Sequence, residues 1–159
     1  MPIEMNELFG IAGKVAVITG AGGVLGGNIA KHFMRQGAKV VAVDIRQEQL
    51  DKRVSELKQY GNEVIGVVGD VLDVASLGKL AGQVLSQWGK IDILLNIAGG
   101  NMPGATLEPE QHFYDMDIAC WEKVTGLNMN GTVSVNGLRQ SDGGTKERLY
   151  CQCIFDGRL

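Results

Sequence analysis

A run of small residues near the start of the sequence joins two contrasting segments. Residues 19–27 (TGAGGVLGG) follow a continuous β-branched stretch and precede a stretch with the apolar spacing of an amphipathic helix. Glycines at such a turn let the backbone approach a phosphate, and the helix N-terminus supplies amide donors and partial positive charge. A pyrophosphate-binding turn is therefore expected, with a merely structural turn as the alternative. Its contact residues would be Thr19, Gly20, Gly22, Gly23, Val24, Leu25 and Gly26.

An acidic residue ends the next apolar stretch. Asp44 stands 24 residues after Gly20 and is followed by Ile45, which we expect at the same site. A carboxylate there accepts hydrogen bonds from the adenosine ribose hydroxyls and repels a 2′-phosphate, so NAD is favoured over NADP. Arg46, two residues further on, could reverse this preference. A solvated aspartate at a strand end is the alternative.

Two later segments complete the expected crevice. Asp70 and Val71 follow a third apolar stretch, and we expect them near the adenine, one by hydrogen bond and one by packing. Asn96, Ala98 and Gly99 follow a fourth stretch, where small residues let a dinucleotide pass. The Asn96 amide can tie two strand ends together, although a turn residue is the alternative.

These segments need an alternating framework of strands and helices. Strands are expected at 14–19, 39–44, 63–68 and 91–95. Helices are expected from the glycine run to Gly37 (with Leu25, Ile29 and Phe33 buried), from Gln47 to Gly61, from Asp73 to Gly89, and after Asp117. The pattern predicts an α/β, Rossmann-type doubly wound parallel sheet of order 3-2-1-4, with the ligand crevice between strands 1 and 4.

Composition narrows the classes of partner. The formal net charge of −3 argues against a nucleic-acid footprint and against an anionic membrane surface. No apolar run approaches the ~20 residues of a membrane span, and residues 1–10 lack the features of a signal peptide, so a cytoplasmic location is expected. Cys120, Cys151 and Cys153 form no CxxC pair, and the two histidines lack metal-ligand spacing, so no metal site is expected.

Together these motifs resemble the short-chain dehydrogenase/reductase family. Residues 19–26 follow its TGxxxGxG motif with Val24 at the middle glycine, and residues 96–99 follow NNAG with Ile97 at the second asparagine. Asp70-Val71 matches the adenine-contact pair, and residues 127–132 (LNMNGT) match a segment of the fourth helix. The resemblance implies NAD-dependent hydride transfer on a small molecule, a homo-oligomeric parent, and Asn128 as the catalytic asparagine that holds a water in a proton relay.

The string GGVLGG and the loop AGGNMPGATLEPEQHFYDMD look more narrowly like the mannonate/fructuronate-type oxidoreductases of that family. This likeness, over roughly residues 7–133, implies a sugar acid as substrate, oxidised or reduced at an alcohol or ketone. The loop of residues 96–116 is far longer than the usual ~4–6 residues, so we expect it to cap the substrate. Gly100 and Asn101 are the candidates for contact with the sugar-acid carboxylate.

Residues after Val133 depart from the family pattern. Its long apolar helix, its serine-bearing fifth strand and its Tyr-x-x-x-Lys pair are all missing from residues 134–159. Codons read one base later would restore the expected continuation, which favours a frameshift over a divergent natural end. We therefore expect residues 1–133 to form an NAD(P)-binding Rossmann domain, with residues 134–159 as a non-native or disordered tail. Strand 5 should be missing, with 151–155 the best candidate to cover the open edge.

Two functions remain open. One is an oxidoreductase whose intact parent moves a hydride between NAD and a sugar-acid alcohol or ketone. The other is a catalytically inactive nucleotide-binding fragment, which suits a chain without Tyr-x-x-x-Lys. A methyltransferase with the same sheet is disfavoured, because the TG run and the NxAG segment suit a dinucleotide.

Overall fold

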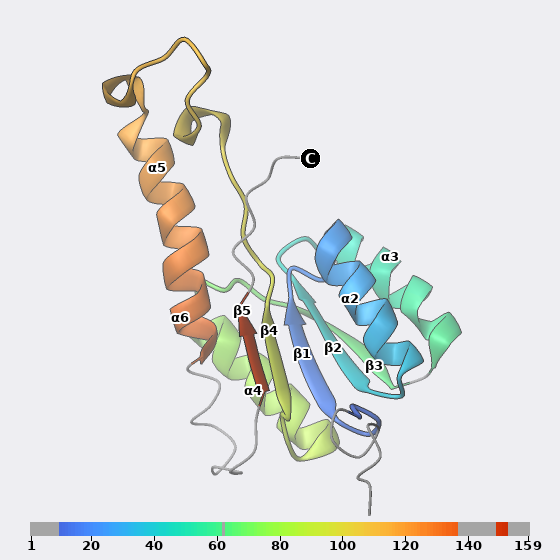
Figure 1. Cartoon of the computed structure of the whole chain (residues 1–159). Coiled ribbons are helices and arrows are strands. Elements are labelled where there is room, and N and C mark those ends of the chain that lie inside the picture. The colour runs from blue at the N-terminus through green and yellow to red at the C-terminus, as the bar shows by residue number, and fades with distance from the viewer. Residues whose placement is uncertain (1–9, 62, 137–148, 153–159) are drawn as a thin grey trace, which may run out of the picture.

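Parallel strands form the centre of the molecule, and all of them point toward the same edge (Figure 1). The computed structural model describes residues 10–61, 63–136 and 149–152. The sheet has the order β3-β2-β1-β4-β5, so the expected 3-2-1-4 order is confirmed. The strand bounds are β1 Val15–Thr19, β2 Lys39–Asp44, β3 Val64–Val68, β4 Ile93–Asn96 and β5 Leu149–Gln152.

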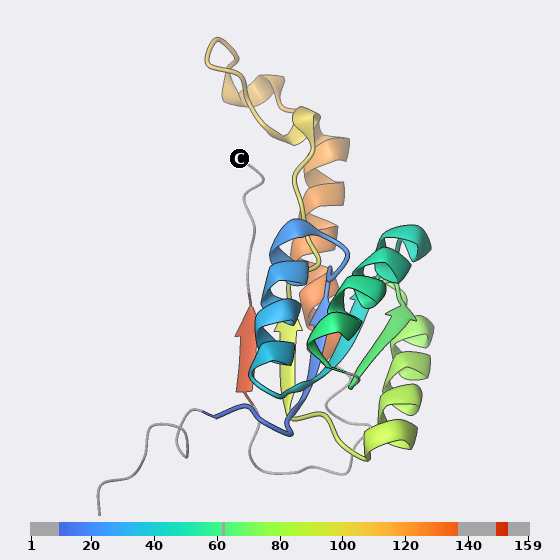
Figure 2. The same cartoon turned by 90° about the vertical axis from the view of Figure 1, so that its right-hand side faces the viewer.

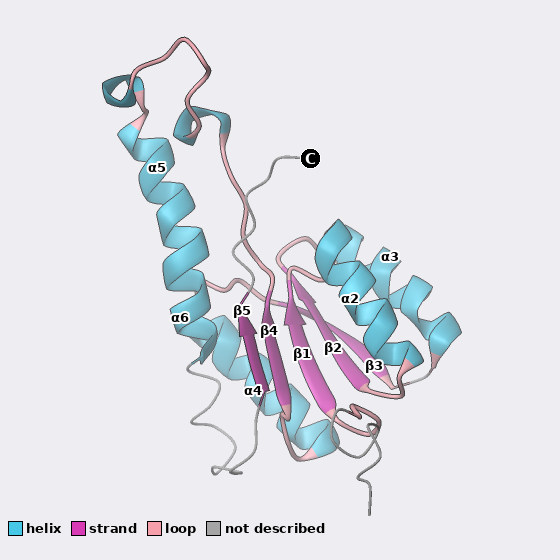
Figure 3. Cartoon of the chain, in the orientation of Figure 1, coloured by secondary structure: helices cyan, strands magenta, loops and turns pink. Residues whose placement is uncertain are grey.

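Helices cover both faces of this sheet, as the doubly wound class requires (Figures 2 and 3). α2 and α3 pack on one face, and α4 and α6 pack on the other. α5 leads into α6 through a π-helical segment, Gly126–Asn130. The helix bounds are α2 Val24–Arg35, α3 Gln47–Leu57, α4 Val74–Trp88, α5 Ile118–Thr125 and α6 Gly131–Asn136.

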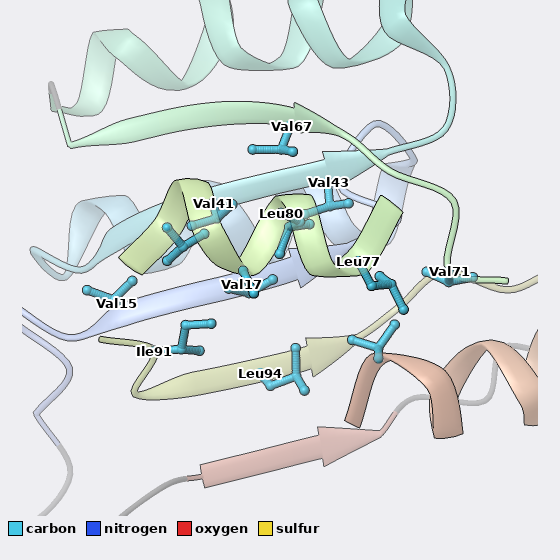
Figure 4. Packing of buried hydrophobic residues seen from close by; sticks show 13 residues of the cluster. Val15, Val17, Val41, Val43, Val67, Val71, Leu77, Leu80, Ile91 and Leu94 are labelled. Atoms are coloured by element: carbon cyan, nitrogen blue, oxygen red, sulfur yellow. The ribbon is translucent and has the colours of Figure 1, made fainter. Parts of the chain in front are cut away.

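The two apolar layers follow from the alternation of side chains along the strands. Val15 and Val17 of β1 point toward α4, where they meet Leu80, while Ala16 and Ile18 point toward α2 and α3 (Figure 4). These four side chains are fully buried. Each buried valine or isoleucine contributes about 1.5–3 kcal/mol of transfer free energy, so β1 anchors the site at its carboxyl end.

Local helix signals in the sequence are confirmed. The Asp73 carboxylate accepts a hydrogen bond from Ala75 N at 2.9 Å and caps α4. Gly89 ends α4 with a φ of 72°, a left-handed conformation that favours glycine. Asp117 caps α5 by accepting from Ala119 N and Cys120 N.

The expected apolar stripe of α2 is confirmed only in part, since Ile29 and Phe33 pack against the core and Leu25 does not. Leu25 is exposed, and Ile29 and Phe33 are only half-buried. The buried residues of this helix are Gly26, Gly27, Ala30 and Met34. The first turn of α2 lies directly after the glycine turn, where Gly26 and Gly27 face inward, and the larger Met34 is buried further along the helix.

A fifth strand is present, which corrects the expectation that it would be missing. β5 pairs with β4 in parallel, from Ile93↔Leu149 to Asn96↔Gln152. It begins two residues before the segment proposed to cover the edge, and residues 153–155 lie outside the described part. An unpaired β4 edge would leave a row of backbone N–H and C=O groups without partners, which β5 supplies.

Within the described ranges, none of the helices combines the length and apolar character needed to cross a membrane. α6 continues past the expected domain boundary at Val133 as far as Asn136.

Candidate functional site

The turn after β1 depends on glycine at two points. Gly20 has a φ of 66°, and a Cβ on it would lie 2.8 Å from Ala98 N. Gly26 could not carry a Cβ either, because the Gly20 carbonyl oxygen occupies that position. Gly23 N donates to Gly20 O at 3.0 Å and closes the turn. The turn is therefore tight and brings bare backbone to the carboxyl edge of the sheet.

Asp44 at the end of β2 is buried and holds this turn from the side. Its Oδ2 accepts from Gly22 N at 3.0 Å. Its Oδ1 accepts from Arg46 N at 3.0 Å and from Arg46 Nε at 3.1 Å. A Cβ on Gly22 would lie 2.7 Å from Oδ2, so the absence of a side chain admits the carboxylate. The charge of Asp44 is thus shared with a guanidinium that is itself more than half exposed.

Thr19 ties the ends of β1 and β4 together. Its hydroxyl oxygen accepts from Ile97 N and from Ala98 N, both at 3.0 Å, and the hydroxyl donates to Leu95 O at 3.4 Å. We expected this task for Asn96, but its side chain makes no such bond among the described residues. Asn96 is buried, but its Oδ1 has no hydrogen-bond partner among the described residues.

A cavity of about 260 Å³ opens at the carboxyl ends of β1 to β4. It gathers residues from four separate turns of the chain, as the crevice rule for such sheets requires. Asp70 Oδ1 accepts from Leu72 N at 2.8 Å, which fixes the turn after β3. The expected cofactor residues that line the cavity are Gly20, Asp44, Ile45, Asp70, Val71, Ala98 and Gly99.

The other expected cofactor residues lie around this cavity. Gly22, Gly23 and Val24 line a neighbouring groove of about 420 Å³ on the outer side of the turn. Thr19, Gly26 and Asn96 are buried beneath the turn, and Leu25 is exposed on α2. The sequence interpretation did not place Val43, Gly69 and Leu127 at the cavity, although their positions at strand ends and on the fourth helix gave the signal.

Asn128 lies in the π-helical segment and faces Gly100. Its Nδ2 donates to Gly100 O at 2.9 Å, and its Oδ1 accepts from Gly100 N at 3.0 Å. Gly99 could not carry a Cβ, because the Asn128 Oδ1 fills that space. The asparagine therefore fixes the segment after β4 with both ends of its amide.

The two candidate substrate contacts already have partners. Gly100 N donates to Asn128 Oδ1, and the Gly100 carbonyl accepts from Asn128 Nδ2. Asn101 Nδ2 donates to Thr106 Oγ1 at 2.7 Å, and Asn101 Oδ1 accepts from Met102 N at 2.8 Å. Asn101 thus shapes the start of the long loop. Residues 101–117, which we call the projecting arm, extend beyond the carboxyl edge of the sheet (Figure 1).

One carboxyl group and one thiol near these elements have shifted pKa values. Hydrogen bonds from the Cys120 backbone and side chain, stronger than its slight desolvation, lower the pKa of Asp117. The same carboxylate raises the pKa of the Cys120 thiol. Neither group reaches the cavity. No cluster of His, Cys, Asp and Glu that could hold a metal ion occurs in the part of the chain that the structure describes.

Comparison with known proteins agrees with this geometry. The short chain dehydrogenase family model matches residues 14–139. The chain belongs to this family. The uncharacterized oxidoreductase UxuB of Bacillus subtilis (strain 168) is 37% identical over 139 residues, which cover 82% of this chain and 49% of that protein. The chain thus spans about half the length of such curated relatives.

Solved structures of this family share the fold. A protein from Haemophilus influenza, described as a candidate D-mannonate oxidoreductase and solved with bound NAD, superposes with a TM-score of 0.78 at 30% identity. The match covers 87% of this chain and 53% of that one. A short chain dehydrogenase/reductase from Burkholderia phymatum in complex with NAD gives a TM-score of 0.71 at 31% identity, over 84% of this chain and 45% of that one.

Proposed function

We propose that this chain binds NAD in the cavity at the carboxyl ends of β1 to β4. The observation that carries the proposal is the cradle around Gly20 and Gly22, where added Cβ atoms would meet Ala98 N and Asp44 Oδ2. Bare backbone at the N-terminus of α2 suits a pyrophosphate, and Asp44 and Asp70 stand where the adenosine half would lie. Two similar proteins have NAD bound in their solved structures.

Asp44 and Arg46 together would set the preference for NAD. The Asp44 carboxyl group is buried where the adenosine ribose would lie, and a carboxylate there would repel a 2′-phosphate. Arg46 balances part of that charge through its 3.1 Å contact. Removal of Asp44 should release the guanidinium to bind a 2′-phosphate, and removal of Arg46 should strengthen the exclusion of NADP.

The experiment is a titration of the purified chain with NAD and with NADP by calorimetry. The unmodified chain should bind NAD at least about 10-fold more tightly than NADP. Asp44→Ala should narrow or invert that ratio, and the matched variant Arg46→Ala should widen it. Equal affinity for both cofactors in the unmodified chain, or no NAD binding at all, would contradict the proposal.

We further propose that the parent protein is an oxidoreductase acting on a sugar acid at an alcohol or ketone. NAD supplies the hydride-transfer chemistry when bound. The support for this substrate class is the likeness to the candidate D-mannonate oxidoreductase. In this chain, Thr19 and Asn128 fix the backbone on either side of the space that the nicotinamide would need.

The amino-acid sequence of this chain also supports a second candidate function, NAD binding without turnover. None of Tyr60, Tyr114 and Tyr150 is followed by lysine four residues later. Proton transfer to or from the substrate oxygen therefore lacks the family's acid/base pair. We expect no NADH formation above background with sugar acids, and measurable turnover by the purified chain would refute this. The domain boundary at Val133, the homo-oligomeric parent and the cytoplasmic location stay predictions.

A further inference from the structure

An arginine from α3 lies across the second glycine of α2, just behind the glycine turn. A Cβ on Gly27 would overlap Arg53 at Cζ and Nε, so the arginine side chain can hold this position only while residue 27 is glycine. Arg53 is only 23% exposed, although it belongs to a surface helix. The groove on α2 and the guanidinium that fills it therefore depend on one another.

The guanidinium reaches the turn itself. Nη2 of Arg53 donates to the Gly23 carbonyl at 3.3 Å, and Nη1 donates to Glu56 Oε2 at 2.7 Å. Nε is buried and has no hydrogen-bond partner among the described residues. A long, charged side chain is thus held in one geometry at a cost, which calls for a compensating role.

Gly23 is the residue on which that geometry acts. It is the N-cap of α2, and no side chain of its own caps the helix. Its carbonyl also accepts from Gly27 N at 3.0 Å, so Arg53 and the first helical hydrogen bond share one oxygen. A cation beside a helix N-terminus is unfavourable, and the Glu56 carboxylate offsets part of that cost here. A diphosphate bound at the start of α2 would offset more of it.

We propose that Arg53 is a positioning residue for the pyrophosphate-binding turn, and that Gly27 is the residue that admits it. This inference rests on the proposed NAD binding. Arg53 clamps α3 to the Gly23 carbonyl, which holds the amides at the start of α2 in place before the cofactor arrives. Arg53 contacts the turn that would bind the pyrophosphate. Its loss should therefore leave the adenosine-binding part of the site, around Asp44 and Asp70, unchanged.

The first arm of the test measures ligand binding by calorimetry, well below the melting temperature. Arg53→Met should weaken NAD binding about 10-fold, and adenosine, which lacks the pyrophosphate, should bind within about twofold of the unmodified chain. Lys52→Met is the matched control, since Lys52 is an exposed cation of the same groove. It should change NAD affinity less than about threefold.

The second arm measures melting without any ligand. A helical Gly→Ala exchange normally stabilises, but Gly27→Ala should lower the melting temperature by about 4 °C because the new Cβ displaces Arg53. In an Arg53→Ala background the overlap is gone, so the same exchange should raise the melting temperature. This inversion of sign does not depend on cofactor binding.

The outcomes separate the two proposals. No NAD binding by the unmodified chain would overturn the proposed function, and the role of Arg53 toward the pyrophosphate would fall with it. With NAD bound normally, equal losses for Arg53→Met and Lys52→Met, or equal losses for NAD and adenosine, would overturn the positioning role alone. If Gly27→Ala changed the melting temperature in the same direction with Arg53 and with Ala at position 53, the inference that Gly27 admits Arg53 would be overturned.

Discussion

The glycine turn at residues 19–27 and the projecting arm at residues 101–117 are held in opposite ways. The turn is fixed by hydrogen bonds to residues far away in the sequence: Gly22 N donates to Asp44, and the Thr19 hydroxyl accepts from Ala98 N. The arm is fixed by neighbours, such as Asn101 for Met102 N and Asp115 for His112 N. The backbone at the proposed phosphate site is thus fixed before any ligand binds, while the arm has exposed side chains and hydrogen bonds between near neighbours in the sequence.

The largest expected difference is between two glycines. Gly20→Ala combines a positive φ with an overlap on Ala98 N, so it should lower the free energy of unfolding by about 3 kcal/mol. Gly100→Ala is the control beside the arm, since a Cβ there would meet nothing within 4 Å. Urea denaturation of both variants measures the difference. Similar losses would show that the turn is no more constrained than the start of the arm.

The second largest expected difference is between two threonine hydroxyls, one at the turn and one in the arm. Thr19→Val removes the acceptor of one buried and one partly buried backbone N–H group and should cost about 2 kcal/mol of unfolding free energy. Thr106→Val in the arm loses its bond to Asn101 Nδ2, but water can replace that bond, so the cost should be about 0.5 kcal/mol or less. If Thr106→Val proved the more costly exchange, local bonds in the arm would matter more than we infer.

The sequence predicted what local signals determine. Asp73, Gly89 and Asp117 mark helix ends by chemistry contained within a few residues, and all three are confirmed. The open edge of β4 pointed to residues 151–155 as its cover, but the bounds of β5 were not predicted, because its pairing partner lies more than fifty residues away.

The site shows the same division. That Asp44 and the glycine turn would meet was predictable, because both lie at the carboxyl ends of adjacent strands. The sequence could not show that Thr19, and not Asn96, joins β1 to β4. Both are polar residues at a strand end, and only the pairing register distinguishes them. The overlap of Arg53 with Gly27 likewise needs the packing of two helices.

A pH dependence at the opposite end of the sheet gives a smaller effect. Burial of Asp92 raises its pKa, but the contacts with Lys90 and Val15 N outweigh it, so the pKa lies below its usual value. A lowered folded-state pKa means that the stabilisation is present above the unfolded value of 3.8 and is lost as the pH falls through the folded value. Asp92→Asn should therefore cost about 1 kcal/mol or less at pH 7 and converge with the unmodified chain near pH 2.

Thermal melting of Asp92→Asn and of the unmodified chain from pH 7 to pH 2 measures whether their stabilities converge. Asp117→Asn is the counterpart at the end of the projecting arm, because the pKa of Asp117 is also lowered while its carboxylate is fully exposed. A constant gap between Asp92→Asn and the unmodified chain at every pH would show that the charge of Asp92 is not the source of its stabilisation.

The smallest expected effect tests whether the arm is independent of the cavity. Phe113 and Tyr114 are 80% and 81% exposed, so Phe113→Ser with Tyr114→Ser should change the unfolding free energy by less than about 0.5 kcal/mol. NAD affinity should stay within about twofold, because neither side chain lines the cavity. A loss of several-fold in NAD affinity at unchanged stability would mean that the arm closes over the bound cofactor. The contrast between turn and arm would then hold only for the ligand-free chain.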